Sequence, residues 1–596
     1  MSLFRRLHAA CVIVSVLVAA APVAHAQSVQ AASLFPASGS TDVNPDTHLV
    51  LTFASAPVLA AAGKIRIVDA ADNRLVDTLD LAIPAAPPPA PKTVVPYTDK
   101  PYDYATARRT NADTVPGTPS GRAVATPANA QLTIIGGFSD AFHFYPVIVR
   151  GKVATIYPHH NLLAYNHSYY VEIDAGIVRT AEGEFAGIKG PQRWTFTTRR
   201  APPPANAARL VVAADGSGDF NTVQGALDAI PDFNTTPVTV FIKNGVYEEI
   251  VYFRNKRHLV IVGEDRDKVV VKYANNEVFN PHPANIGTNE LPGSFPSRRA
   301  AFMADNAQDV ALVNFSIVNQ AGGQAEGLLI SGEHNIVSRV SITGAGDALQ
   351  VNGPTYLEDC QVTGTGDTVL SRGPAFFRRC ELHSQRAFVW GRNTAANHGD
   401  VFVDSRFITR DGGVTDISRA PSNKGKTYPF AEVVLIDATL DGISAEGWGD
   451  IDGDTANLHF WEYRSVNGAD GRLVDVSRRK RASRQLALPA DAQVIADYRN
   501  PAYVLGGWTP TLAPQVLTQP VALVAGGQLT FSVTAAALPA PTYQWTKDGV
   551  PIAGARAATL TLSHPPASDA GQYAVRISNA AGSAMSAPAE FELRSK

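Results

Sequence analysis

The sequence GAGDALQVNGPTYLEDC, residues 344–360, is followed after an offset of 20 residues by a second copy of its pattern, GTGDTVLSRGPAFFRRC, residues 364–380. Glycine, aspartate, proline and cysteine recur at the same places, and Tyr356 of the first copy corresponds to Phe376 of the second. A short repeat of β-forming residues between turn residues is typical of a solenoid, in which stacked coils bury their apolar side chains against one another.

The interior position that the cysteines hold in this repeat recurs in four further apolar runs, at intervals of 20 to 33 residues. Parallel strands in stacked coils lie about 4.8 Å apart, so equivalent residues of successive coils become near neighbours. We therefore predict an all-β chain with a right-handed parallel β-helix over residues 205–510. The equivalent interior residues in the further runs are Phe315, Val340, Ser405 and Ala438.

A short helix is predicted ahead of the strands, over residues 222–230. Val223, Ala226, Leu227 and Ile230 fall at helical spacing in this stretch and so form one apolar face. Such a helix would cap the first coil, whose strand edges and apolar interior are otherwise open.

Both flanking regions predict further β-domains. Residues 30–199 contain short runs of alternating apolar and polar residues, which predict a β-sandwich with a surface insertion. Its opening, FPASGSTDVNPDTHLVLTF, resembles the bacterial Ig-like modules that precede secreted enzymes. The three prolines at 202–204 predict a stiff linker to the middle region.

Residues 515–596 predict a C-terminal Ig-like module. Trp545 stands where a tryptophan packs in the core of such a sandwich, and Tyr573 stands where the tyrosine corner forms. Val575 takes the place of the second core cysteine, with Val533 as its expected partner. We expect the module either to contact carbohydrate or a cell surface, or to act as a spacer.

The formal charge of −3, from 51 basic and 54 acidic residues, excludes the basic excess that nucleic-acid binding needs. Residues 1–26 combine two arginines, an apolar run and a small-residue site, which is the pattern of a cleavable secretory signal and not of a membrane span. We therefore expect a secreted or periplasmic protein. The spacing of cysteine and histidine residues predicts no metal site.

The repeat brings Cys360 and Cys380 to equivalent positions on adjacent coils. Their Cα atoms would lie about 5 Å apart, which is within the range that a disulfide requires. An even pair of cysteines in an exported chain permits such a bond. We therefore predict a disulfide that joins two stacked coils.

The same repeat places Asp347 beside Asp367, each directly after a Gly-x-Gly turn. Two carboxylates about 5 Å apart resist simultaneous ionisation, so one keeps its proton to higher pH than the other. A proton donor next to a carboxylate nucleophile is a hydrolytic arrangement. The structural alternative is that each aspartate only forms a turn.

The middle region resembles the pectin methylesterase (pectinesterase) family, because the motifs of that family occur in the same order. They include ADGSGDFNTVQGALDAIP at 214–231, VFIKNGVYEE at 240–249, VIVGEDRDKVVV at 260–271, FMADNAQDVALVNFSIVN at 302–319, QAEGLLISGEHNIVSRVSITGAGD at 324–347, GTGDTVL at 364–370, DGISAEGW at 441–448 and FWEYRSVNG at 460–468. The resemblance implies a divergent bacterial branch of the family.

The resemblance also implies a role for each candidate catalytic residue. Asp367 matches the nucleophile of the family, and Asp347 matches its acid/base. Gln324 matches a glutamine that holds the oxyanion, and Arg419, in SRAP, matches the arginine that keeps the nucleophile ionised. No cofactor is implied.

The chain also departs from the family pattern. Gly346 replaces a second oxyanion glutamine, Ala345 and Thr368 replace aromatic residues, and the arginine motif lacks its tryptophan. Aromatic side chains stack on sugar faces, so other residues are needed to make this contact. The candidate substrate-binding residues are Trp390, Arg392, Trp448 and Tyr428.

The function expected from this pattern is hydrolysis of methyl-esterified polygalacturonate to pectate and methanol. Three alternatives remain open at this point: an esterase for another acyl substrate with the same aspartate pair, a calcium-dependent polysaccharide lyase on the same fold, and a noncatalytic carbohydrate-binding or adhesion protein. Methanol release that does not require calcium distinguishes ester hydrolysis from the lyase reaction.

Overall fold

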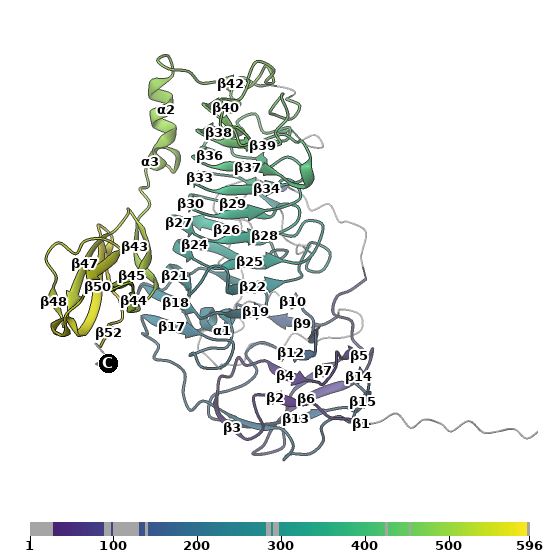
Figure 1. The fold of residues 1–596 in the computed structure, drawn as a ribbon. Helices are drawn as coiled ribbons and strands as arrows, with labels where there is room; N and C mark the ends of the chain where they lie inside the picture. The colour runs from purple at the N-terminus through teal and green to yellow at the C-terminus, as the bar shows by residue number, and fades with distance from the viewer. Residues whose placement is uncertain are drawn as a thin grey trace, which may run out of the picture.

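The computed structural model describes residues 28–88, 97–98, 130–136, 141–281, 288–289, 297–422, 427–451 and 454–592. Figure 1 shows three successive parts: a group of sheets at the N-terminal end, a tall stack of coils, and a smaller sandwich at the C-terminal end. The predicted signal segment, residues 1–26, lies outside the described residues.

The N-terminal part buries one apolar core between its sheets. Residues of β4 (Leu49–Thr52) alternate between buried and partly exposed, as predicted, and Trp194 is fully buried in the core. One sheet contains β3 (Ser40–Val43), β16 (Thr195–Thr198), β13 (Ser168–Ile173), β6 (Lys64–Asp69) and β7 (Leu75–Asp80). A second contains β11 (Val147–Arg150), β12 (Val153–Ile156), β4 and β2 (Ser33–Phe35). A third sheet contains β1 (Ser28–Val29), β15 (Gly183–Phe185), β14 (Val178–Thr180) and β5 (Val58–Leu59). Two strand pairs complete the set: β9 (Leu132–Ile134) pairs with β10 (Ala141–His143), and β8 (Tyr97–Thr98) pairs with β23 (Thr288–Asn289) of the middle region.

The middle part is a parallel β-helix with three faces, on which strands pair in parallel with strands of neighbouring coils. The first face contains β20 (Val251–Arg254), the first half of β24 (Phe302–Val313), β26 (Leu328–Glu333), β29 (Leu349–Asn352), β32 (Val369–Ser371) and β35 (Val389–Gly391). The second contains β17 (Arg209–Val212), β18 (Val238–Ile242), β21 (Arg257–Gly263), the second half of β24, β27 (Asn335–Ser338), β30 (Thr355–Glu358), β33 (Ala375–Arg378), β36 (Asp400–Val403), β38 (Glu432–Ile436), β40 (His459–Tyr463) and β42 (Arg484–Gln485). The third contains β19 (Gly245–Glu248), β22 (Val269–Tyr273), β25 (Ser316–Asn319), β28 (Ser341–Thr343), β31 (Gln361–Thr363), β34 (Glu381–Ser384), β37 (Arg406–Thr409), β39 (Thr439–Asp441) and β41 (Val466–Asn467).

The repeat found in the sequence is the pairing register of two adjacent coils. Leu349 pairs with Val369 on the first face, and Gln361 pairs with Glu381 on the third. The predicted interior position is confirmed, because its residues are all buried and each directly precedes a third-face strand. These residues are Phe315, Val340, Cys360, Cys380, Ser405 and Ala438.

Seven successive coils, from β24 onward, turn from the second face to the third at a residue with positive φ. Asparagine and aspartate tolerate this left-handed conformation better than most residues, which explains why they occupy four of these seven turns. The seven residues are Asn314 (61°), Arg339 (57°), Asp359 (55°), Arg379 (50°), Asp404 (52°), Asp437 (55°) and Arg464 (53°).

The predicted capping helix is present as α1 (Val223–Asp228), and all six of its residues are buried. Thr222 caps it by accepting a hydrogen bond from the backbone of Gly225 at 3.0 Å. Asp46 of the N-terminal part accepts backbone hydrogen bonds from Asn221 at 3.0 Å and from Thr222 at 2.8 Å. The N-terminal part therefore docks at the capped end of the stack.

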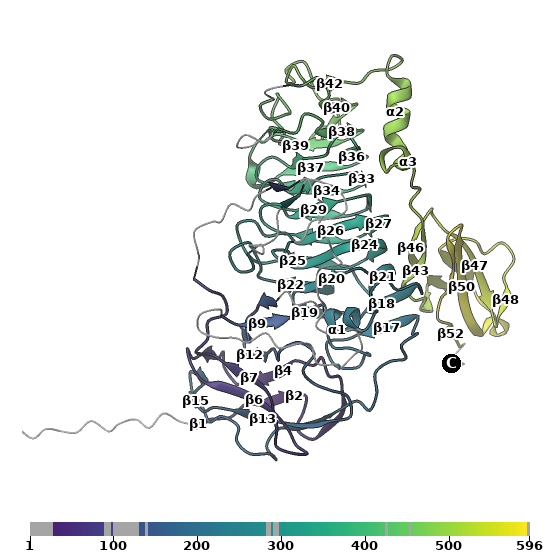
Figure 2. The same cartoon turned by 180° about the vertical axis from the view of Figure 1, so that it is seen from behind.

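After the last coil the chain returns along the second face, as Figures 1 and 2 both show. The helices α2 (Ala492–Arg499) and α3 (Pro501–Val504) lie on this face, where Ile495 and Tyr498 share an apolar cluster with Phe376 and Val434. Because this cluster belongs to the second face, the strands of the first face do not contribute to it.

The C-terminal module has the predicted Ig-like core. Trp545 is fully buried, and the hydroxyl of Tyr573 donates to the carbonyl of Asp569 at 2.8 Å, which is a tyrosine corner. Val533 and Val575 are both buried in this core. The strands are β43 (Leu512–Thr518), β44 (Leu523–Ala525), β45 (Gln528–Ser532), β46 (Thr534–Leu538), β47 (Thr542–Lys547), β48 (Val550–Pro551), β49 (Thr559–Ser563), β50 (Gly571–Asn579), β51 (Gly582–Met585) and β52 (Ala589–Phe591).

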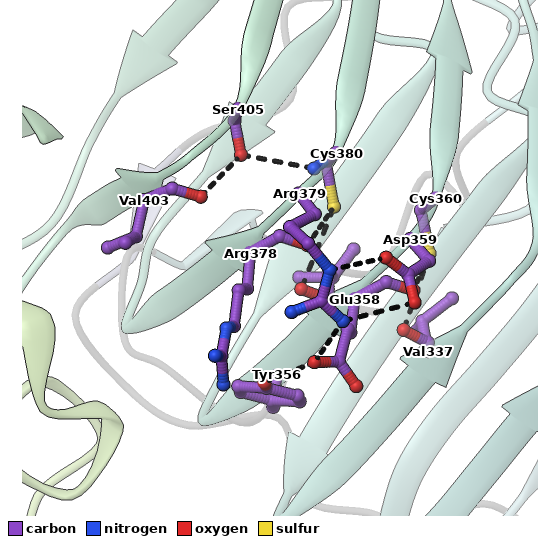
Figure 3. A network of polar contacts seen from close by, with 11 residues as sticks. Val337, Tyr356, Glu358, Asp359, Cys360, Arg378, Arg379, Cys380, Val403 and Ser405 are labelled. Atoms are coloured by element: carbon purple, nitrogen blue, oxygen red, sulfur yellow. Dashed lines mark hydrogen bonds and ion pairs between the residues drawn. The ribbon is translucent and has the colours of Figure 1, made fainter. Parts of the chain in front are cut away.

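The structure contains Cys360 and Cys380 as free, buried thiols, so the predicted disulfide is absent from it. Figure 3 shows both at the turn into the third face, where the Cys360 thiol donates to the carbonyl of Val337 at 3.3 Å. The Cys380 thiol donates to the carbonyl of Leu357 at 3.6 Å. Coils in register hold equivalent side chains parallel and about 4.8 Å apart, whereas a disulfide brings its Cβ atoms to about 3.8 Å.

We expect both cysteines to be recovered as thiols. Alkylation with iodoacetamide in denaturant, without a reductant, should label Cys360 and Cys380, and the native protein should remain unlabelled because both side chains are buried. Peptide mass spectrometry measures the result. Recovery of a peptide pair joined through these two cysteines would contradict the arrangement.

Candidate active site

The candidate catalytic residues gather where the first-face strands begin. Asp347 stands two residues before β29, and Asp367 stands two residues before β32. Gly346 forms a parallel bridge with Gly366 on the next coil and another with Gln324 on the preceding coil. Three successive coils therefore bring Gln324 and the two aspartates to one edge of the stack.

The Asp347 carboxylate is held by two donors. Its Oδ2 atom accepts one hydrogen bond from the Gln324 side-chain amide and one from Nη2 of Arg299, each at 3.1 Å. The side chain of Asp347 is only 5 % exposed. The carboxyl group is therefore covered by protein and fixed in orientation.

Arg299 and its partner Glu326 were missed by the sequence reasoning. Nε of Arg299 donates to Oε1 of Glu326 at 2.6 Å, and the Glu326 side chain is fully buried. Burial raises the pKa of Glu326 to about 7, Arg299 opposes this rise, and the charge of Asp347 adds to it. A signal existed: a charged residue inside the otherwise apolar run AEGLLI demands a buried partner.

Asp367 lies in a more open environment. Its Oδ2 atom accepts a hydrogen bond from Nη1 of Arg419 at 2.6 Å, and its side chain is 20 % exposed. This pairing agrees with the partner that the sequence resemblance implied. The exposed fraction leaves the Asp367 carboxylate accessible from solvent.

Burial raises the pKa of the Asp347 carboxyl above its ordinary value of 3.8, and the charge of Arg299 opposes this rise. Burial also raises the pKa of Asp367; Arg419 opposes this rise, and the negative charge of Asp347 adds to it. Two carboxyl groups on adjacent coils resist simultaneous ionisation. The pair is therefore expected to retain one proton at pH values where an isolated aspartate is fully ionised.

The ring of Trp390 supports the side chain of Arg419. The backbone N–H of Arg419 donates to the carbonyl of Val389 at 3.0 Å, which ties it to β35. The guanidinium of Arg419 lies 4.3 Å from the centroid of the Trp390 ring, and that of Arg392 lies 4.7 Å from the same centroid. These cation–π contacts hold Arg419 in position beside Asp367.

The structure corrects the predicted substrate contact of Trp448. Its side chain is fully buried and stacks on Phe460, with ring centroids 4.9 Å apart. Trp390, Arg392 and Tyr428 are also largely buried, but they lie together next to Arg419. Their contact with substrate stays a prediction.

Within the described ranges, no group of three or more histidine, cysteine, aspartate or glutamate side chains is arranged to hold a metal ion. The helices of these same ranges include none that is both long and apolar enough to cross a membrane.

Stacked parallel coils with two aligned aspartates, each paired with an arginine, define a parallel β-helix protein with a carboxylate-pair centre. The sequence profile of the Pectinesterase family matches residues 209–488, and that of the Immunoglobulin domain matches residues 513–579. Probable pectinesterase 56 of Arabidopsis thaliana is 30 % identical over 254 residues, which cover 40 % of this chain and 84 % of that protein. This chain belongs to the pectinesterase family.

Other curated relatives match over a smaller share of their own length. Probable pectinesterase 30 of Arabidopsis thaliana is 26 % identical over 294 residues, covering 46 % of this chain and 56 % of that protein. The chain spans about half the length of the first curated relatives, 56 % and 50 % for two of them. Among solved structures, the pectin methylesterase from carrot has a TM-score of 0.41 at 21 % identity, covering 50 % of this chain and 93 % of that chain.

Glu326 should make the protein less stable as the pH rises. Its pKa of about 7 in the folded state lies above its ordinary value of 4.5, so between these values the folded chain binds more protons than the unfolded chain. The free energy of unfolding therefore falls as the pH rises through this interval. Glu326→Gln should remove a contribution of about 2–3 kcal/mol to this fall.

Calorimetry at about pH 5 and pH 7.5 measures this effect as a smaller loss of Tm in the variant. Glu333→Gln is the matched control, because Glu333 ends the neighbouring strand β26 and is exposed. Equal pH dependence of Tm in wild type and Glu326→Gln would show that Glu326 is ionised at both pH values.

Proposed function

We propose that this protein is a carboxylic ester hydrolase that removes methyl groups from methyl-esterified polygalacturonate, giving pectate and methanol. The observation that carries the proposal is the alignment of Asp347 and Asp367 on adjacent coils, the first covered and the second open to solvent. Family membership and the pectinesterase names of the relatives support the same substrate class.

In the first step, a carboxylate oxygen of Asp367 attacks the carbonyl carbon of the ester. The carbonyl electron pair moves onto oxygen, and the amide of Gln324 donates a hydrogen bond to the resulting oxyanion. As the carbonyl re-forms, the bond to the methoxy oxygen breaks, and Asp347 gives its proton to that oxygen. Methanol leaves, and an acyl anhydride remains on Asp367.

In the second step, a water molecule attacks the acyl carbon while Asp347, now ionised, takes a proton from it. The bond between the acyl carbon and the Asp367 oxygen then breaks. The product leaves as a carboxylic acid that releases its proton to solvent, Asp367 is ionised again, and Asp347 holds its proton for the next cycle.

The environments of the two aspartates support this division of roles. A nucleophile must reach the substrate, and the side chain of Asp367 is 20 % exposed whereas that of Asp347 is 5 % exposed. A proton donor must stay protonated, and burial raises the pKa of Asp347. Arg419 favours the ionised form of Asp367 through its hydrogen bond and charge.

A second candidate function is hydrolysis of a different acyl ester by the same centre. The burial of Trp448 favours it, because one predicted aromatic contact with a sugar face is lost. A panel of methyl, acetyl and feruloyl esters on polysaccharides and small alcohols distinguishes the two. A kcat/KM for methanol release from pectin that is higher than the kcat/KM for any other ester supports pectin demethylation.

The proposal includes an arrangement of the whole chain. Residues 1–26 act as a cleavable signal, residues 205–510 carry the reaction, and the outer domains at 30–199 and 515–596 accompany it outside the cytoplasm. The C-terminal module is proposed to contact carbohydrate or a cell surface.

Replacement of the nucleophile should abolish the reaction. Asp367→Asn keeps the left-handed backbone, because asparagine tolerates a φ of 45°, but removes the attacking charge. Methanol release from high-ester pectin should fall by about 10,000-fold or more. Asp404→Asn is the matched control, because Asp404 is an exposed turn aspartate with a φ of 52°. Full activity in Asp367→Asn would refute the assigned nucleophile.

Loss of Arg419 should move the pH dependence of the reaction. Arg419 lowers the pKa of Asp367, so Arg419→Gln should raise that pKa and shift the acid limb of the kcat/KM profile to higher pH. Methanol release between about pH 4 and pH 9 measures the shift. Arg406→Gln, which removes an exposed arginine of β37, is the control. An unshifted acid limb in Arg419→Gln would show that another group controls it.

A further inference from the structure

Two N–H donors point at the same oxygen atom in the candidate site. Gln324 Nε2 and Arg299 Nη2 each lie 3.1 Å from Oδ2 of Asp347. This is the distance at which preorganised donors stabilise an oxyanion during acyl transfer. The site therefore contains a pair of donors for a negatively charged oxygen, of which the sequence had indicated only Gln324.

The orientation of Arg299 is fixed from the other side. Its Nε atom donates to Glu326 at 2.6 Å, and its side chain is 16 % exposed, whereas Glu326 is fully buried. Nη2 also lies 3.5 Å from the Gln350 oxygen, and Nη1 makes no hydrogen bond to any residue in the described ranges. The guanidinium thus has one edge held by protein and free donor capacity next to Asp347.

We propose that Arg299 is a catalytic residue, whose guanidinium forms with the Gln324 amide the donor pair that holds the oxyanion of the tetrahedral intermediate. The inference rests on the proposed ester hydrolysis. Glu326 acts as a positioning residue, since it holds Nε of Arg299 and turns Nη2 toward the reacting atoms.

Arg299 follows the negative charge as it moves during the first step. While Asp347 is protonated, its carboxyl is a weak acceptor and Arg299 is available to the oxyanion. When the carbonyl re-forms and Asp347 gives its proton to methanol, the negative charge passes to Asp347, and Arg299 returns to it. Because a charged donor forms a stronger hydrogen bond than an amide, one arginine can supply what Gly346 lacks.

The test compares Glu326→Gln with the double variant Arg299→Gln/Glu326→Gln, in which the removal of Arg299 leaves no ionised glutamate at position 326 behind. The double variant should lose about 100- to 1000-fold in kcat on methyl-esterified pectin relative to Glu326→Gln, with KM little changed, because one oxyanion donor is missing. A loss confined to KM, or unchanged kinetics in the folded double variant, would overturn the inference.

A rescue experiment excludes a merely structural role. Residue 346 pairs with Gln324 in parallel, so a side chain placed there points the same way as Gln324. A Cβ atom at position 346 would lie 3.0 Å from the carbonyl oxygen of Gly323, which requires only a small shift of the loop. Gly346→Gln added to the double variant should recover kcat at least tenfold, and Gly346→Leu, of similar size but without donors, should not. Equal recovery with both, or with neither, would overturn the inference.

Failure of the proposed function is recognised separately. If wild type releases no methanol from pectin or from any other methyl ester, ester hydrolysis and the role of Arg299 both fall. If wild type is active and Asp367→Asn is not, but the Arg299 variants keep wild-type kcat, only the role of Arg299 falls.

Discussion

The hydrogen-bonded stacking of parallel coils is the constraint on which the rest of this structure depends. Residues that pair across it, such as Gly346 and Gly366, lie on neighbouring coils although they are far apart along the chain. The same stacking lines the interior with equivalent residues of successive coils and sets one aspartate over another at the edge. The core and the candidate site thus both depend on the pairing register of adjacent coils. A change in the length of the coil at 344–364 would disturb both.

Charge balance decides what the aligned aspartates can do. Two carboxylates side by side would repel each other, but Arg299 and Arg419 pair with one each, and Glu326 shares Arg299. Burial favours protonation of Asp347, while part of the Asp367 side chain is accessible from solvent. The returning helices pack on the second face, and the N-terminal part docks on the capping helix.

The residues of the repeat also show where sequence reasoning succeeds. The repeat and the apolar runs that extend it predicted which residues share an interior position and that Asp347 and Asp367 stand together, and the resemblance to the pectinesterase family supplied Gln324 and Arg419. Spacing did not decide whether Trp448 faces solvent, because the loop that carries it has no counterpart in the repeat. The spacing also suggested a disulfide between Cys360 and Cys380, because it predicts the positions of their Cα atoms. It does not predict whether the two parallel side chains converge.

By itself the sequence determined the solenoid, its capping helix, the C-terminal Ig-like core and the alignment of the aspartate pair, because each depends on periodic spacing or on local motifs. Only the tertiary structure decided that Arg299, 27 residues before Glu326, meets both it and Asp347. That contact depends on how coils of unequal length close, and on where long side chains point once closed. Long-range packing sets both, and no local pattern records them.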